Sequence, residues 1–153
     1  TAPYHWSGDV SGIDVVVSDV FVEKMGGLGL DAGQVDALRS WVTRIPAPPV
    51  SAALDADASA RGKALFEDAT VGCSGCHSGP KLTNNESVDV GTGGKFQVPS
   101  LLGLSIRAPY LHDGRAATLR GHFGASNAGS MHGKTSQLTS AELDDLVVYL
   151  ETL

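Results

Sequence analysis

The sequence predicts an all-α fold, a class of protein in which helices and long loops enclose one core. Two amphipathic helices, one near each end of the chain, carry the same type of N-terminal cap. The 153 residues include 19 glycines but only nine aromatic residues, which indicates a loop-rich chain with little aromatic bulk. A hydrophobic content of 42% still supplies a core and excludes a wholly disordered chain. We therefore expect a bound group to fill part of the core volume.

The helix at the C-terminus is predicted by its cap and by its apolar face. Residues 139–142 read Thr-Ser-Ala-Glu, a capping box in which the Thr and Glu side chains satisfy free backbone amides. Four apolar residues then recur at the spacing of one helical face: Leu143, Leu146, Val147 and Leu150.

A second helix near the start matches the C-terminal one at a shift of 108 positions. Residues 31–34, Asp-Ala-Gly-Gln, form its cap, and the apolar residues Val35, Leu38, Val42 and Ile45 follow. Upstream, residues 2–8 parallel residues 108–114, and a methionine follows each Ala-Pro-Tyr at the same distance. This is an internal repeat with only its second copy complete.

Three segments follow from the repeat. Residues 1–45 are predicted to be the C-terminal half of a first repeat, and residues 46–56 a stiff Pro/Ala-rich linker. Residues 57–153 form the complete domain, beginning with a helix over residues 57–66. Residues 78–107 are expected to be mostly loop, with tight turns at Gly91, Gly93 and Gly94.

The two cysteines lie in Cys73-Ser74-Gly75-Cys76-His77, a C-x-x-C-H motif that is typical of covalent haem attachment. Two thiols at this spacing add to the two vinyl groups on one porphyrin edge, and the adjacent imidazole reaches the iron. A thioredoxin-like pair would need βαβ periodicity, and a zinc site would need a second ligand pair. Two core cysteines beside a chance histidine are the remaining alternative. The motif predicts one covalent haem c.

With the motif in place, the chain resembles a class I-type cytochrome c domain preceded by a helical half-domain. Gly62 and Phe66 match the first-helix pair that crosses the C-terminal helix in such cytochromes, where Leu146 and Tyr149 would be their partners. Three segments further resemble the bacterial di-haem cytochrome c peroxidase superfamily: His-Ser-Gly-Pro at 77–80, Val-Pro-Ser-Leu at 98–101, and Ala-Pro-Tyr-Leu-His-Asp-Gly at 108–114. That resemblance implies two tandem cytochrome c domains.

The chain also departs from that superfamily. Leu102 stands where the family usually has an arginine that pairs with a haem propionate, and only one C-x-x-C-H is present. Arg107 is the candidate to replace that arginine as a propionate partner. A solvated surface role for Arg107 is equally compatible with the sequence.

The sixth ligand of the iron has two leading candidates, Met131 and His132, which are alternatives because neighbouring residues cannot both bind. Met131 matches Met25 in the repeat and lies in the Gly/Ser-rich stretch 124–133, whereas family members with His-Gly-x-Thr-Ser favour His132. His77 is the proximal ligand. His112 is expected to brace a loop or a propionate, and His122 to be structural or exposed.

The function predicted first is one-electron transfer by a low-spin haem. The alternative is a fragment or electron-input module of a di-haem peroxidase-like enzyme, and a haem sensor is a third class. The net charge of −6 argues against nucleic acid and favours a redox partner with a basic patch. No apolar run could span a membrane, and covalent attachment implies a periplasmic or other extracytoplasmic site. A second chain or a preceding segment would complete the first repeat.

Overall fold

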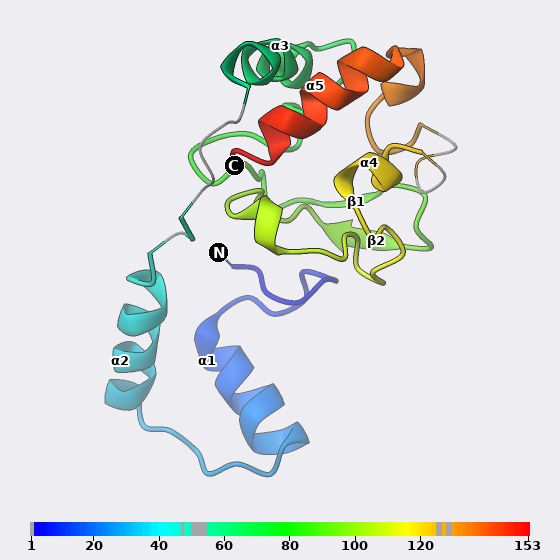
Figure 1. Ribbon diagram of the computed structural model, residues 1–153. Coiled ribbons are helices and arrows are strands. Elements are labelled where there is room, and N and C mark those ends of the chain that lie inside the picture. The colour runs from blue at the N-terminus through cyan, green and yellow to red at the C-terminus, as the bar shows by residue number, and fades with distance from the viewer. Residues whose placement is uncertain (1, 47, 50–54, 125–126, 128–129) are drawn as a thin grey trace. The chain divides into compact units, whose positions relative to one another are not determined.

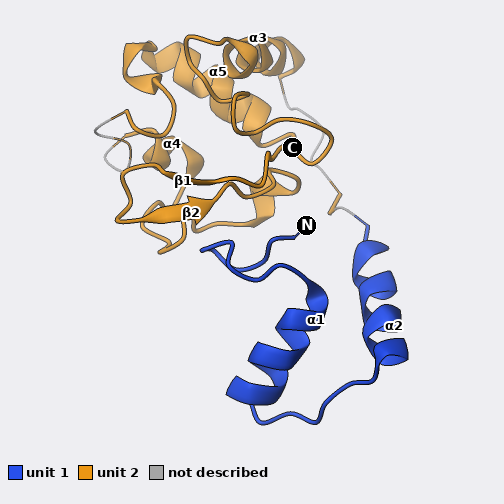
Figure 2. Cartoon of the chain, turned by 180° about the vertical axis from the view of Figure 1, so that it is seen from behind, with its two compact units in different colours: residues 1–47 blue, residues 48–153 orange. Residues whose placement is uncertain are grey.

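The computed structural model describes residues 2–46, 48–49, 55–124, 127 and 130–153. The chain separates into two compact units, an N-terminal unit of Thr1–Ala47 and a C-terminal unit of Pro48–Leu153 (Figure 2). Most of the predicted linker, residues 46–56, lies outside the described residues. Within the described ranges, none of the helices is both long and apolar enough to cross a membrane.

The N-terminal unit is built from two helical segments. α1 (Ile13–Val15) continues as the π-helix η1 (Val16–Lys24), and α2 (Ala32–Thr43) follows after a loop (Figure 1). The predicted capping box of α2 is confirmed, since Asp31 accepts from the Gln34 amide and the Gln34 side chain accepts in return. No residue of α2 is buried, so its apolar face is only partly covered within this unit.

The described residues of the C-terminal unit form three α-helices, a small hairpin and short 3-10 turns, and Figure 1 shows the order of the helices and strands. Its elements are α3 (Ala56–Glu67), β1 (Ser87–Asp89), β2 (Lys95–Gln97), η2 (Leu104–Ile106), α4 (Leu119–His122), η4 (Thr135–Gln137) and α5 (Ser140–Leu150). The capping box of α5, formed by Thr139 and Glu142, is confirmed.

The antiparallel hairpin β1–β2 shows that the fold is helix-rich rather than strictly all-α. Val88 pairs with Phe96 across the two strands, a combination of β-branched and aromatic side chains that stabilises such pairs. Between the strands, Gly91 and Gly93 adopt positive φ angles of 77° and 100°, as a tight connection requires. The turns expected at these glycines therefore connect a pair of short strands.

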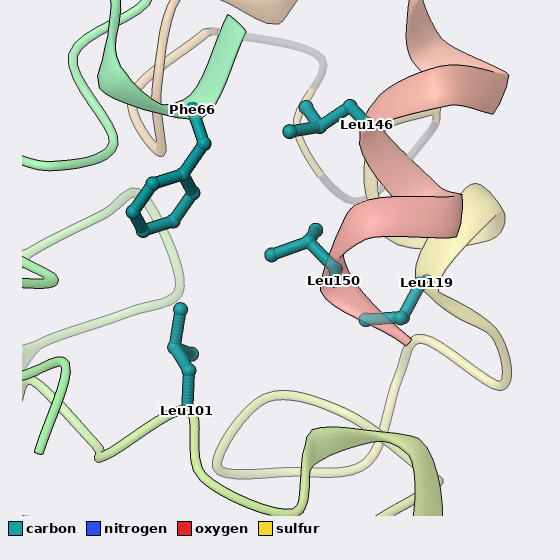
Figure 3. Packing of buried hydrophobic residues seen from close by; sticks show 5 residues of the cluster. All are labelled: Phe66, Leu101, Leu119, Leu146 and Leu150. Atoms are coloured by element: carbon teal, nitrogen blue, oxygen red, sulfur yellow. The ribbon is translucent and has the colours of Figure 1, made fainter. Parts of the chain in front are cut away.

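The core forms where α3 crosses α5. A Cβ built on Gly62 would lie 2.0 Å from the Asp145 carbonyl oxygen, so the two backbones approach closely only because position 62 has no side chain. Next to this contact the rings of Phe66 and Tyr149 lie 5.4 Å apart. The predicted helix crossing is therefore confirmed. Figure 3 shows the apolar side chains that converge beneath it: Phe66, Leu101, Leu119, Leu146 and Leu150.

The turns at residues 4–10 and 110–116, which begin the matching halves of the two predicted repeat copies, share features of backbone conformation. An isolated bridge joins Tyr4 to Val10 in the first copy, and another joins Tyr110 to Ala116 in the second. Positive φ angles recur at equivalent places, 66° and 68° at His5 and Gly8, and 70° and 69° at Leu111 and Gly114. The repeat in sequence is thus matched by a repeat in local structure.

Candidate haem-binding site

The C-x-x-C-H segment forms one tight turn directly after α3. The amide of His77 donates to the carbonyl oxygen of Cys73 at 3.0 Å, and the amide of Ser74 donates to the last turn of α3 at Phe66. These bonds hold both thiols and the imidazole on a single turn that is anchored to the core. Both thiols are free.

His77 is buried and already oriented by the backbone. Its side chain is 8% exposed, and its Nδ1 lies 3.2 Å from the carbonyl oxygen of Leu82. Because a carbonyl only accepts, Nδ1 carries the proton and Nε2 is left free to bind a metal. Burial lowers the pKa of His77, which favours the neutral imidazole that a metal needs.

Three histidines from distant parts of the sequence meet in the C-terminal unit. The ring centres of His77 and His132 lie 6.0 Å apart with an interplanar angle of 28°. The ring of His122 meets that of His132 at 4.7 Å and 67°. Burial, reinforced by the neighbouring histidines, lowers the pKa of His132 to about 3 and that of His122 to about 4. All three rings are therefore neutral at neutral pH.

The spacing of His77 and His132 fits a haem iron bound between them. Two imidazoles that bind one metal from opposite sides, through bonds of about 2 Å, have ring centres roughly 6 Å apart. In addition, Nδ1 of His132 and Nδ1 of His122 are buried without a hydrogen-bond partner in the described part of the chain. Buried polar atoms are rarely left unpaired, so each of these two rings still needs a partner for its Nδ1.

The chemistry of Cys73 favours haem attachment over a thiol redox pair. Burial raises the pKa of the Cys73 thiol to about 11. Redox-active C-x-x-C pairs instead have a thiol whose pKa is lowered, because the thiolate is the reactive form. The segment after His132 passes over this cysteine, since a Cβ built on Gly133 would lie 3.8 Å from the Cys73 sulfur. The amide of Lys134 completes this contact by donating to the Val71 carbonyl at 2.9 Å.

Asn127 is a site residue that sequence reasoning missed. Its buried side chain accepts from the His132 amide at 3.0 Å and donates to the His132 carbonyl at 3.0 Å. The same amide nitrogen reaches the carbonyl of Gly133 and the hydroxyl of Thr135. Asn127 thus fixes the backbone on both sides of His132. Within the stretch 124–133 that was expected to carry the distal ligand, residues 125–126 and 128–129 lie outside the described residues.

The other predicted site residues lie elsewhere. Met131 is 56% exposed, and its sulfur packs over Gly91, where a Cβ would lie 2.9 Å away. The exposed guanidinium of Arg107 donates to the carbonyls of Ser100 and Leu102, and its predicted contact with a propionate stays a prediction. The ring of His112 stacks on that of Phe96 with centres 3.8 Å apart, and its predicted role in bracing a loop or a propionate stays a prediction. Met25, in the N-terminal unit, is 70% exposed.

Several known proteins are similar to this chain. A family model described as cytochrome c matches residues 59–153. Hydrazine synthase subunit gamma of Kuenenia stuttgartiensis is 30% identical over an alignment length of 145, and the match covers 63% of this chain and 41% of that protein. Methylamine utilization protein MauG of Methylorubrum extorquens is 33% identical over an alignment length of 127, and the match covers 66% of this chain and 35% of that protein.

A solved structure shares the fold. The structure of Kuenenia stuttgartiensis hydrazine synthase pressurized with xenon matches with a TM-score of 0.85 at 24% identity, over 99% of this chain and 68% of that one. The matched regions amount to less than half the length of each of the two curated relatives.

Proposed function

The chain belongs to the cytochrome c family, and we propose that it transfers single electrons through a low-spin haem whose axial ligands are His77 and His132. The family carries haem c covalently, and Cys73 and Cys76 fit its C-x-x-C-H attachment motif. The observation that carries the choice of ligand is the 6.0 Å separation of the two imidazole rings. Met131, the other candidate, has its sulfur against Gly91 at the surface.

The bound haem supplies a one-electron Fe(III)/Fe(II) couple, and the residues around it determine how that couple is used. The Leu82 carbonyl holds the His77 ring, and Asn127 holds the backbone of His132. With His77 and His132 both bound to the iron, peroxide or a gas would find no open coordination site. This arrangement favours electron transfer over the sensor and peroxidase functions for this domain.

Electron paramagnetic resonance and near-infrared magnetic circular dichroism of the oxidised holoprotein test the ligand assignment. We expect a bis-histidine low-spin spectrum in the wild type and in Met131→Ala, whereas His132→Ala should yield a high-spin iron. Met131→Ala is the matched control, because it truncates the adjacent residue of the same loop. A high-spin Met131→Ala protein beside an unchanged His132→Ala protein would reverse the assignment.

The second candidate function is that of a module in a larger di-haem peroxidase-like enzyme. The repeated turns at 4–10 and 110–116 and the greater length of the curated relatives favour it. Large apolar side chains are also exposed in the N-terminal unit, with Leu28 at 86% and Trp41 at 62%, and a further polypeptide segment or subunit would cover them. Mass spectrometry of the natural protein distinguishes the two candidates, since a di-haem enzyme carries two haem masses for each polypeptide and an electron carrier of this type carries one.

We also infer a redox partner with a basic surface, met outside the cytoplasm. The net charge of −6 steers such a partner toward the chain, and covalent haem attachment in bacteria takes place after export. The rate constant for electron exchange with a basic cytochrome should fall steeply as ionic strength rises. A rate that is independent of salt would exclude this steering.

A further inference from the structure

We propose that His122 is a positioning residue for His132 and accepts a hydrogen bond from the ring nitrogen of His132 that does not face the iron. This inference rests on the proposed ligation of the iron by His132. Nothing in the sequence marks His122 for this task, since it stands ten positions before His132 and outside the attachment motif. It is the contact between their rings that assigns the role.

The two rings are in contact, although no hydrogen bond joins them in the described structure. Their centres lie 4.7 Å apart at an interplanar angle of 67°, an edge-on arrangement. A hydrogen bond of about 2.7–3.2 Å would form in the holoprotein once the rings turn so that a nitrogen of one faces a nitrogen of the other. Each ring also has a buried Nδ1 without a partner in the described part of the chain. Pairing the two imidazoles satisfies both a donor and an acceptor.

A ligand histidine needs such a partner. When one imidazole nitrogen binds a metal, the other carries a proton and almost always donates it to a nearby acceptor. His77 has this acceptor in the Leu82 carbonyl, at 3.2 Å from its Nδ1. For His132, the Asn127 side chain is occupied by backbone groups and by Thr135, so it does not serve the ring. His122, whose ring contacts that of His132, remains as the acceptor for the proton on the second ring nitrogen of His132.

His122 is itself held firmly, as a positioning residue must be. It ends α4, whose cap Thr118 accepts from the Gly121 amide, and its own amide donates to the Thr118 carbonyl at 3.0 Å. Leu119 of the same helix is buried in the core, and the ring of Phe123 lies 5.0 Å from that of His122. His122 is only 7% exposed, so its ring is shielded from water.

The test compares two substitutions of His122 in the holoprotein. His122→Phe keeps an aromatic ring but has no acceptor, and His122→Gln restores an acceptor on a flexible side chain. We expect His122→Phe to keep a low-spin iron but to change the g values, since they depend on the orientation of the axial rings. The midpoint potential should rise by about 59 mV, a tenfold change in the ratio of reduced to oxidised protein, because an axial imidazole that has lost its acceptor is a weaker base. His122→Gln should return both readouts toward the wild type.

Phe123→Leu is the matched control, because it removes ring packing next to His122 without touching the acceptor, and it should leave the g values and the potential unchanged. Unchanged g values and potential in His122→Phe would overturn the proposal and assign His122 to packing alone. Equal shifts in His122→Phe and Phe123→Leu would overturn it in the same way. Failure of the underlying ligation is recognised separately, since His132→Ala would then keep the wild-type spectrum.

Discussion

Replacing Gly62 with alanine should weaken the crossing of α3 and α5. The added Cβ would lie 2.0 Å from the carbonyl oxygen of Asp145, 2.6 Å from its carbonyl carbon and 2.8 Å from Tyr149 Cβ. These neighbours include backbone atoms of α5, which cannot rotate away. To restore an ordinary contact of 3.4 Å, α5 must move by about 1.4 Å.

The magnitude follows from two opposing effects. Alanine in place of glycine gains roughly 1 kcal/mol of helix propensity within α3. Overpacking against a rigid neighbour costs up to about 3 kcal/mol. The net loss in the free energy of unfolding is therefore about 2 kcal/mol, which lowers the melting temperature of a chain of this size by roughly 4–8 °C.

Thermal unfolding of the purified oxidised holoprotein, followed by far-ultraviolet circular dichroism, measures this loss. Ala64→Gly is the matched control, because Ala64 is exposed on the same helix and reports the propensity effect without a clash. It should cost about 1 kcal/mol. If Gly62→Ala melted at or above the wild-type temperature, the close approach of the two helices would not be what requires glycine at this position.

Three further predictions concern other parts of the C-terminal unit. Asn127→Ala should cost about 1–3 kcal/mol in unfolding experiments and broaden the low-spin resonance signal, because it removes the hydrogen bonds that fix His132; a sharp, unchanged signal would argue against this role. The double change of Cys73 and Cys76 to alanine should abolish covalent haem retention on denaturing gels, and retained haem would exclude these thiols as the attachment points. Arg61 holds the pKa of Asp145 below its ordinary value of 3.8, so this carboxylate stabilises the fold above that pH and loses its effect as the pH falls through the folded pKa. Asp145→Asn should therefore flatten the acid limb of a plot of melting temperature against pH, and a limb as steep as that of the wild type would assign acid sensitivity to other groups.

Helices α2, α3 and α5 could be predicted from the sequence because their signals are local, whereas the helical segment from Ile13 to Lys24 and the short α4 were not predicted. The capping boxes that begin at Asp31 and Thr139 mark the starts of α2 and α5, and in each box the two paired residues lie only three positions apart in the sequence. Gly62 and Phe66 lie one helical turn apart, so a family resemblance was enough to identify the face of α3 that meets α5. The attachment motif is equally local, since five consecutive residues carry it.

The distal side of the site could not be predicted in the same way, because it depends on contacts between distant segments. His122 ends a four-residue helix, which is too short for a periodic pattern of apolar residues to reveal a buried face. From the sequence alone, His122 was expected to be either structural or exposed. Asn127 stands in a stretch rich in glycine and serine, where an asparagine is expected in a turn on general grounds. The hairpin was missed because each strand has three residues, too few to show alternation.

The buried amide of Asn127 also bears on the choice between Met131 and His132. These residues are adjacent, so bringing the Met131 sulfur toward His77 requires the backbone at 131–132 to rotate. That rotation would break the bonds that Asn127 makes to both the amide and the carbonyl of His132, and each such bond contributes about 1 kcal/mol. It would also lift the Met131 side chain from Gly91 and leave the His132 ring without its contact to His122. The contacts of this loop therefore favour the His132 imidazole over the Met131 thioether as the iron ligand. Asn127→Ala is the variant in which Met131 would gain access to the iron.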